Sequence, residues 1–170
     1  VEEINVSRFD TRNVTSMNSM FSGCERVQEI NVSGFDTRNV TDMRFMFAWC
    51  NSAEEINVSR FDTRNVTNMS CMFFFCTNLQ KLDLSGFNTR NVIYMGHMFY
   101  NCESVQEINV SGFDTRNVID MSHMFYNCIN VQESDLSKFD VRSAEHLGLL
   151  RNHLNKKQLL RILKKKDKII

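Results

Sequence analysis

The chain has 170 residues, of which 42% are hydrophobic and 24% are charged, proportions that do not fit a disordered segment. No apolar run approaches the ~20 residues that a membrane-spanning helix needs. The formal net charge is zero, but residues 1–150 carry 12 Lys or Arg against 19 Asp or Glu, whereas residues 151–170 carry eight against one. The main part of the chain is therefore acidic and its end is basic.

A 26-residue repeat organises the sequence. Six phenylalanines recur at this spacing without an insertion or deletion: Phe9, Phe35, Phe61, Phe87, Phe113 and Phe139. A fixed period between 20 and 50 residues is typical of stacked units that pack mainly on their neighbours. We therefore predict an α/β solenoid over residues 1–143, with five full repeats and a degenerate sixth, followed by a C-terminal segment over residues 144–170.

The first predicted element of each unit is a short parallel strand. In residues 27–33, Ile30 and Val32 are expected to point inward, and Glu29 and Asn31 outward. The outward acidic column is Glu3, Glu29, Glu55, Glu107 and Glu133, interrupted by Lys81. Two interpretations remain open for this Glu ladder: an anionic surface for a cationic partner, and a solvated face that keeps the strands soluble.

A polar corner follows each strand, as in the segment GFDTRN of residues 34–39. Side chains such as Asn88, Thr89 and Asn91 are expected to satisfy the backbone amides of this corner. An arginine stands in every corner, forming the ladder Arg12, Arg38, Arg64, Arg90, Arg116 and Arg142. This Arg ladder is either a basic ridge for phosphate, sulfate or carboxylate groups, or a set of ion pairs with the corner aspartates.

The last predicted element of each unit is a short helix or 3₁₀ turn. Met43, Met46, Phe47 and Cys50 are spaced as i, i+3, i+4 and i+7, which is typical of one helical face. We expect these Met, Phe and Cys columns to form the core, with reduced cysteines. Together, strand, corner and helix predict a right-handed, leucine-rich-repeat-like coil.

Positions that differ between units are candidates for function, because packing does not fix them. Several aromatic residues occupy such positions, and we expect them to form an exposed strip that binds a protein or glycan, or partly to join the core. The candidate residues are Arg44, Phe45, Trp49, Phe74, Phe75, Tyr94, Tyr100 and Tyr126. Cys71 shares an outward column with Phe45 and is expected to be the reactive thiol.

The C-terminal segment differs from the repeats. Leu147, Leu150 and Leu154 form a stripe that is expected to cap the last unit. Farther on, leucine and isoleucine alternate with lysine and arginine, a pattern typical of a basic amphipathic helix. This tail is expected either to complete the cap or to contact an anionic membrane or nucleic acid.

The segment LDLSGFNTRNVIYMGHMFYNC, residues 82–102, resembles the BspA-like bacterial surface proteins with 26-residue leucine-rich-type repeats. That family also occurs among Gram-positive surface proteins and mycoplasma lipoproteins, and the resemblance covers about residues 1–143. It implies export, display at the cell surface and binding roles such as adhesion. It implies no catalytic residues.

The expected function is therefore non-catalytic binding of an unidentified host or neighbouring-cell protein or glycan by a monomer at the cell surface or outside the cell. No nucleophile–base pair, phosphate-binding loop or paired-carboxylate cleft is evident in the sequence. We expect no cofactor, metal or small-molecule substrate. The alternatives are a structural spacer or self-assembling scaffold without its own ligand, and electrostatic membrane or nucleic-acid binding through the tail.

Overall fold

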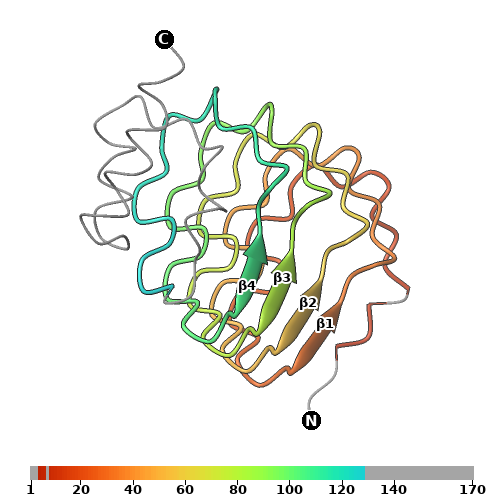
Figure 1. The fold of residues 1–170 in the computed structure, drawn as a ribbon. Helices are drawn as coiled ribbons and strands as arrows, with labels where there is room; N and C mark the ends of the chain where they lie inside the picture. Colours follow the sequence, from red (N-terminus) through yellow and green to blue (C-terminus); the bar gives the residue numbers. More distant parts are fainter. Residues whose placement is uncertain (1–3, 7, 129–170) are drawn as a thin grey trace, which may run out of the picture.

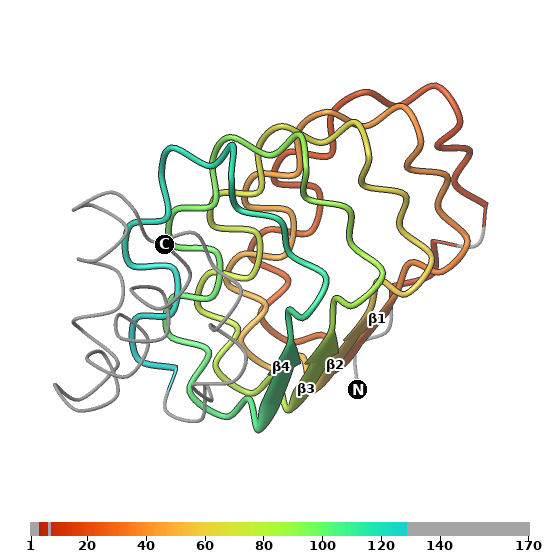
Figure 2. The ribbon, with the colours of Figure 1, turned by 45° about the horizontal axis from the view of Figure 1, so that its top comes forward.

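The computed structural model describes residues 4–6 and 8–128, which form a stack of 26-residue units with one parallel sheet along one side (Figures 1 and 2). Its strands are β1 (Glu29–Asn31), β2 (Glu55–Asn57), β3 (Lys81–Asp83) and β4 (Glu107–Asn109), arranged side by side in chain order. The units are numbered 1 to 5 by the corner phenylalanine that recurs every 26 residues: Phe9, Phe35, Phe61, Phe87 and Phe113. The repeating strands confirm a repeat protein, and the arrangement is compatible with a solenoid.

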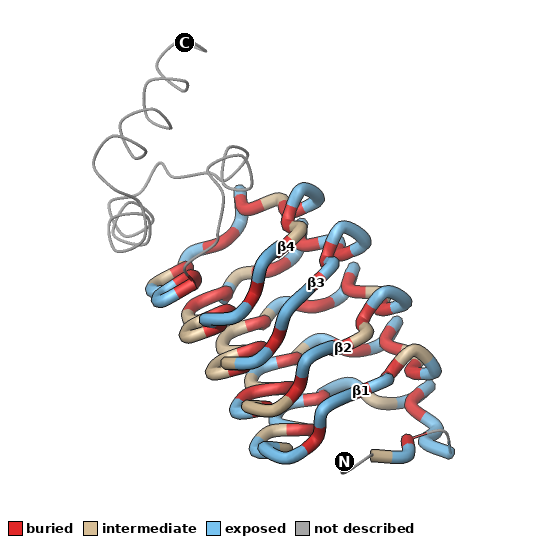
Figure 3. The backbone as a smooth tube through the Cα atoms, turned by 60° about the horizontal axis from the view of Figure 1, so that its bottom comes forward, coloured by how far each residue is buried: buried red, intermediate tan, exposed pale blue. Residues whose placement is uncertain are grey.

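The strand prediction is confirmed in position and in register. Ile30 pairs with Ile56, and Leu82 pairs with Ile108, so that each strand buries its central residue. The flanking residues are exposed or half-buried (Figure 3). Between β2 and β3, only Glu55 and Lys81 are paired.

A second set of parallel bridges joins the units on the far side of each coil, linking Ser16, Asp42, Asn68, Tyr94 and Asp120 in turn. Backbone hydrogen bonds continue this ladder along the chain. The N–H groups of Met43, Phe45 and Phe47 donate to carbonyls of the next unit over 2.9–3.1 Å. Alternate backbone donors of each unit are thus satisfied by the unit that follows it.

Within the described residues the units contain no helix, so the helical form of the prediction is not supported, although turns closed by i→i+3 hydrogen bonds are present. Residues 43–50 instead form consecutive turns, in which Met46 N–H donates to Met43 O over 3.3 Å and Cys50 N–H to Phe47 O over 3.3 Å. Phe45 has a φ of 54° and Trp49 a φ of 58°, left-handed values that cannot continue a right-handed helix. The N–H groups of Phe45, Phe47 and Trp49 bond instead to carbonyls of the next unit.

The inward pattern that suggested a helix is nevertheless confirmed. Met43, Met46, Phe47 and Cys50 are all fully buried. The buried phenylalanine rings stack from unit to unit, with centroid distances of 5.5 Å between Phe47 and Phe73 and 5.8 Å between Phe73 and Phe99. A turn that projects every third or fourth side chain inward therefore produces the same spacing in the sequence as a helix.

The cysteines that recur every 26 residues, from Cys24 to Cys128, pack in or against this core. All six cysteines are free, and Cys50, Cys76, Cys102 and Cys128 are buried. The Sγ–H of Cys76 donates to the Phe47 carbonyl over 3.1 Å, and Cys50 and Cys102 make the equivalent contact. Burial raises the pKa of Cys50 to about 12, which disfavours the reactive thiolate form of this residue in the core.

Candidate binding surface

Six aromatic residues on the turn side form one continuous cluster, called here the aromatic strip: Phe45, Trp49, Phe74, Phe75, Tyr100 and Tyr126. Its rings touch across four units. Trp49 contacts Phe74 at a centroid distance of 5.2 Å, Phe74 contacts Tyr100 at 5.1 Å, and Tyr100 contacts Tyr126 at 4.6 Å. The expected strip is therefore present, and its side chains are half-buried or exposed.

Left-handed backbone occurs at two positions of each turn segment and places three of the six side chains of the strip. Phe45, Trp49 and Phe75 all have φ between 54° and 58°, whereas their neighbours Met46 and Cys50 are buried in the core. A non-glycine residue pays a conformational cost for this geometry. Here the ladder of backbone hydrogen bonds to the next unit holds the geometry in place.

The rings of the strip mostly cover one another's faces. Tyr100 and Tyr126 lie only 12° from parallel, and Phe74 and Tyr100 only 27°. The two ends of the strip are the most accessible, because Trp49 and Tyr126 each retain 39% of their surface. Along the middle of the strip, a partner would therefore meet mainly ring edges, which carry partial positive charge.

Two histidines outside the set of candidate residues extend the cluster. His97 and His123 lie at a centroid distance of 5.2 Å, and each also contacts Tyr100. Burial, followed by the neighbouring His123, lowers the pKa of His97, while Asp120 opposes this shift. At neutral pH, His97 is therefore held in its uncharged form.

Arg44 and Tyr94 occupy different surroundings. Arg44 is next to Phe45 in the sequence and forms an ion pair with Asp42, with 2.8 Å between Nη2 and Oδ2. Tyr94 is 41% exposed and is bridged to Asn68 and Asp120 of the adjacent units. No ring contact joins Tyr94 to the strip within the described part of the chain, so its role in a binding surface stays a prediction separate from the strip.

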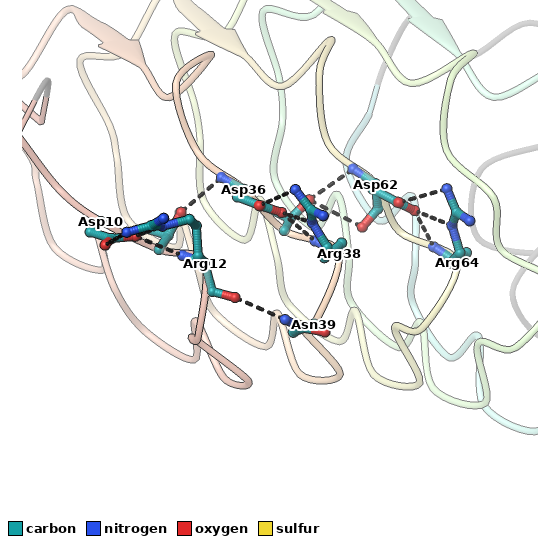
Figure 4. Close-up of polar contacts among 9 residues, drawn as sticks. Asp10, Arg12, Asp36, Arg38, Asn39, Asp62 and Arg64 are labelled. Atoms are coloured by element: carbon teal, nitrogen blue, oxygen red, sulfur yellow. Dashed lines mark hydrogen bonds and ion pairs between the residues drawn. The ribbon is translucent and has the colours of Figure 1, made fainter.

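The Arg ladder forms ion pairs in units 1, 2, 3 and 5 rather than a bare basic ridge, and Figure 4 shows the first three of them. The pairs are Arg12 with Asp10, Arg38 with Asp36, Arg64 with Asp62 and Arg116 with Asp114, at 2.6–2.9 Å. The arginine side chain holds the pKa of each aspartate below its usual value, to about 2 for Asp10 and Asp114. Arg90 has Asn88 in place of the acid, and Arg142 lies outside the described residues.

The corner side chains also satisfy the backbone, as predicted. The hydroxyl of Thr89 accepts from Asp114 N–H over 2.7 Å and donates to Asp114 O over 3.0 Å. Asn91 Nδ2 donates to Arg64 O over 2.7 Å, while Asn88 Oδ1 accepts from Arg90 N–H over 3.2 Å. The corner is thus a structural element first.

The Glu ladder is exposed on the sheet. Glu29 lies beside Glu55, and Lys81 lies between Glu55 and Glu107. Lys81 therefore separates the acidic column into two short parts. Glu3 and Glu133 lie outside the described residues, as does the expected cap over residues 144–170.

The structure does not support the expectation that Cys71 is a reactive thiol. Its side chain is half-buried, and burial followed by the charge of Asp120 raises its pKa to about 11. Within residues 4–6 and 8–128, no group of three or more His, Cys, Asp or Glu side chains is arranged to hold a metal ion. In the same residues, no helix has the length and apolar character needed to cross a bilayer.

The chain was compared with protein families, with curated proteins and with solved structures. Neither the curated proteins nor the solved structures contain a significant match to it. One protein family does match, over residues 2–55 and 47–158, and it is described as "Mycoplasma protein of unknown function, DUF285". Because the match covers most of the sequence, the chain belongs to this family.

Proposed function

We propose that this protein is a non-catalytic binding module that docks a protein partner on the aromatic strip. The observation that carries the proposal is the unbroken series of ring contacts from Trp49 to Tyr126 across four units. A partly exposed aromatic cluster of this extent is typical of interaction surfaces. Tryptophan and tyrosine, with arginine, are also the residues most enriched among binding hot spots.

The orientation of the rings favours a protein over a sugar. The C–H groups of a sugar ring are attracted to the electron-rich face of an aromatic ring, but the parallel stacking of Tyr100 with Phe74 and Tyr126 covers these faces. Ring edges instead attract carbonyl oxygens and the faces of other aromatic rings, which a protein surface supplies. Arg44, still 44% exposed beside its aspartate, adds hydrogen-bond donors next to the strip.

We further propose that the chain is a right-handed, leucine-rich-repeat-like solenoid of the BspA-like type, displayed at the cell surface. Support comes from the 26-residue spacing, the parallel strands in chain order and the resemblance of residues 82–102 to that group. Labelling of intact cells with an antibody to the repeats tests the location. A signal that appears only after permeabilisation would contradict surface display.

The binding proposal is tested with the purified chain on a panel of immobilised extracellular-matrix proteins, with a glycan array in parallel. Trp49→Ala and Tyr126→Ala are expected to weaken binding to a matrix protein at least tenfold, because they remove the two most exposed rings. Tyr94→Ala is the matched control, since Tyr94 is equally exposed but separate from the strip.

The outcomes separate the alternatives. Equal loss in all three variants would show general hydrophobic adhesion and overturn the assignment to the strip. Binding confined to the glycan array would overturn the protein partner. Absence of binding to both panels would favour the structural spacer.

A further inference from the structure

The corner face carries two arginines outside the Arg ladder, Arg8 in unit 1 and Arg60 in unit 3, which share one column of the repeat. Arg60, in unit 3, occupies a column in which units 2, 4 and 5 have Gly34, Gly86 and Gly112. Arg60 is exposed, and its guanidinium makes no hydrogen bond or ion pair with any residue that the structure describes. Corner charge compensation does not extend to Arg60.

A groove of about 730 Å³ lies beside Arg60, between units 2 and 3. Arg38 and Arg64 line it together with their aspartates, Asp36 and Asp62, and Gly34 forms part of its wall. The groove is open beside Gly34, because a Cβ atom there would meet no other atom within 4 Å. Three guanidinium groups and two carboxylates leave one positive charge in excess.

The positive groups are also the more accessible ones. The side chains of Arg38 and Arg64 are 68% and 69% exposed, against 22% and 30% for Asp36 and Asp62. Each of these arginines directs Nε and Nη2 at its aspartate, over 2.7–2.9 Å. The other guanidinium donors remain available, and Arg60 retains all five. Figure 4 shows the paired arginines of units 2 and 3 on this face.

We infer that this groove is an oxyanion-binding site, which takes a phosphate, sulfate or carboxylate group of a ligand on Arg60 and on an adjacent paired guanidinium. A planar guanidinium matches such groups through two parallel N–H bonds. The aspartates order Arg38 and Arg64 beforehand, which lowers the entropic cost of binding. This site lies in the corners and is independent of the aromatic strip.

The test titrates inorganic phosphate and inorganic sulfate, separately, into the purified chain at constant ionic strength maintained with sodium chloride. Arginine Nε signals are followed by NMR, with Arg60 assigned by its loss in Arg60→Gln. We expect a saturable shift at Arg60 for at least one anion. Acetate distinguishes a carboxylate from the tetrahedral anions.

Three variants then locate the site. Arg60→Gln is expected to raise the Kd at least tenfold, and Arg60→Lys to give an intermediate loss because it keeps the charge but not the fork. Gly34→Gln is expected to weaken binding by filling the groove. The matched control is Arg90→Gln, which removes the same charge from a corner arginine without an acid partner and outside the groove; its Kd is expected to stay within threefold.

Two results would overturn the inference. The first is that none of the three anions gives a saturable shift of the Arg60 Nε signal, even when the anion is in 50-fold excess over the protein and its concentration reaches 50 mM. The second is an equal loss in Arg60→Gln and Arg90→Gln, which would show only general attraction of anions to positive charge. Circular dichroism of each variant checks that its fold is intact.

Discussion

Individual polar side chains hold the corners by bonding to the backbone of the next unit. The buried threonine column, Thr11, Thr37, Thr63, Thr89 and Thr115, is the most enclosed polar set in the described residues. Each hydroxyl of Thr37, Thr63 and Thr89 satisfies both the N–H and the C=O of one residue in the following unit. In the corners, these threonine hydroxyls link neighbouring units, as backbone hydrogen bonds do in the strands.

We therefore predict that Thr63→Val destabilises the fold by about 1–3 kcal/mol, although valine has nearly the same shape. In the unaltered chain the Thr63 hydroxyl lies 2.8 Å from the backbone N of Asn88 and 3.1 Å from its carbonyl oxygen. Valine leaves both of these partly buried groups without a hydrogen-bond partner. Urea unfolding measures the effect. Thr63→Ser keeps the hydroxyl and is expected to lose less; an equal loss in both variants would assign the role to the methyl group instead.

His97 gives stability a dependence on pH. Its pKa is lowered by burial and by His123, while Asp120 is the acidic group that opposes the shift. Because the unfolded chain binds the proton more readily, this contribution is complete above the unfolded pKa of about 6.5 and is lost as pH falls through the lower folded pKa. Phe74 and Tyr100 are its other ring neighbours.

The prediction is that unfolding free energy falls less between pH 7.5 and pH 5.5 in His97→Gln than in the unaltered chain. Urea unfolding at the two pH values makes the comparison. His123→Gln serves as the second variant, because it removes only one of the two causes and should reduce the dependence in part. Parallel pH profiles for all three proteins would contradict the role assigned to His97.

At the scale of elements, the sequence predicts the strands and corners but not the turns. The alternation around Ile30 and the polar corner residues identify their elements directly, since each reflects local geometry. The inward spacing of Met43, Met46 and Phe47 is shared by a helix and by consecutive turns, and only φ separates the two. Large residues such as Phe45 and Trp49 conceal a left-handed backbone, whereas Gly23 and Asn101 at equivalent positions hint at it.

The same limits apply to the candidate sites. The aromatic strip follows from the positions that vary between units, because outward columns can be read from the repeat. The repeat does not show which rings contact one another. The candidate residues therefore include Tyr94, for which the described residues show no ring contact with the strip, and omit His97 and His123, which contact Tyr100. Arg60, like Arg8, is visible in the sequence as an arginine in a column that has glycine in units 2, 4 and 5, but its lack of an acid partner is evident only in three dimensions.

Two glycines, one with a left-handed backbone and one without, test how much the left-handed conformation costs in stability. Gly23 has a φ of 77°, and a Cβ there would meet nothing within 4 Å, so Gly23→Ala should destabilise by about 1 kcal/mol through backbone strain alone. Gly34 has equally open surroundings but no positive φ. Gly34→Ala should therefore stabilise by about 0.4–1 kcal/mol, through reduced entropy of the unfolded chain. Thermal unfolding compares them, and a shift in the same direction would refute the backbone argument.

At the scale of the whole molecule, stability depends on stacking between neighbouring units, because each unit packs mainly on the unit before and the unit after it. Phe73 is fully buried and stacks on Phe47 and Phe99. Phe21 occupies the equivalent place in unit 1, the first unit described, and stacks on Phe47 at 5.6 Å. One substitution can therefore be compared in an inner and an outer unit.

Phe73→Ala is expected to cost about 3–5 kcal/mol in the global unfolding free energy, because it opens a cavity between two intact rings. Phe21→Ala is expected to cost less globally and to release unit 1 first, since fewer contacts hold that unit. Amide hydrogen exchange distinguishes the two: protection should fall in units 2 to 4 together for Phe73→Ala, but mainly in residues 8–24 for Phe21→Ala. A uniform loss of protection in both variants would instead indicate a single cooperative core, in which position within the stack has no influence.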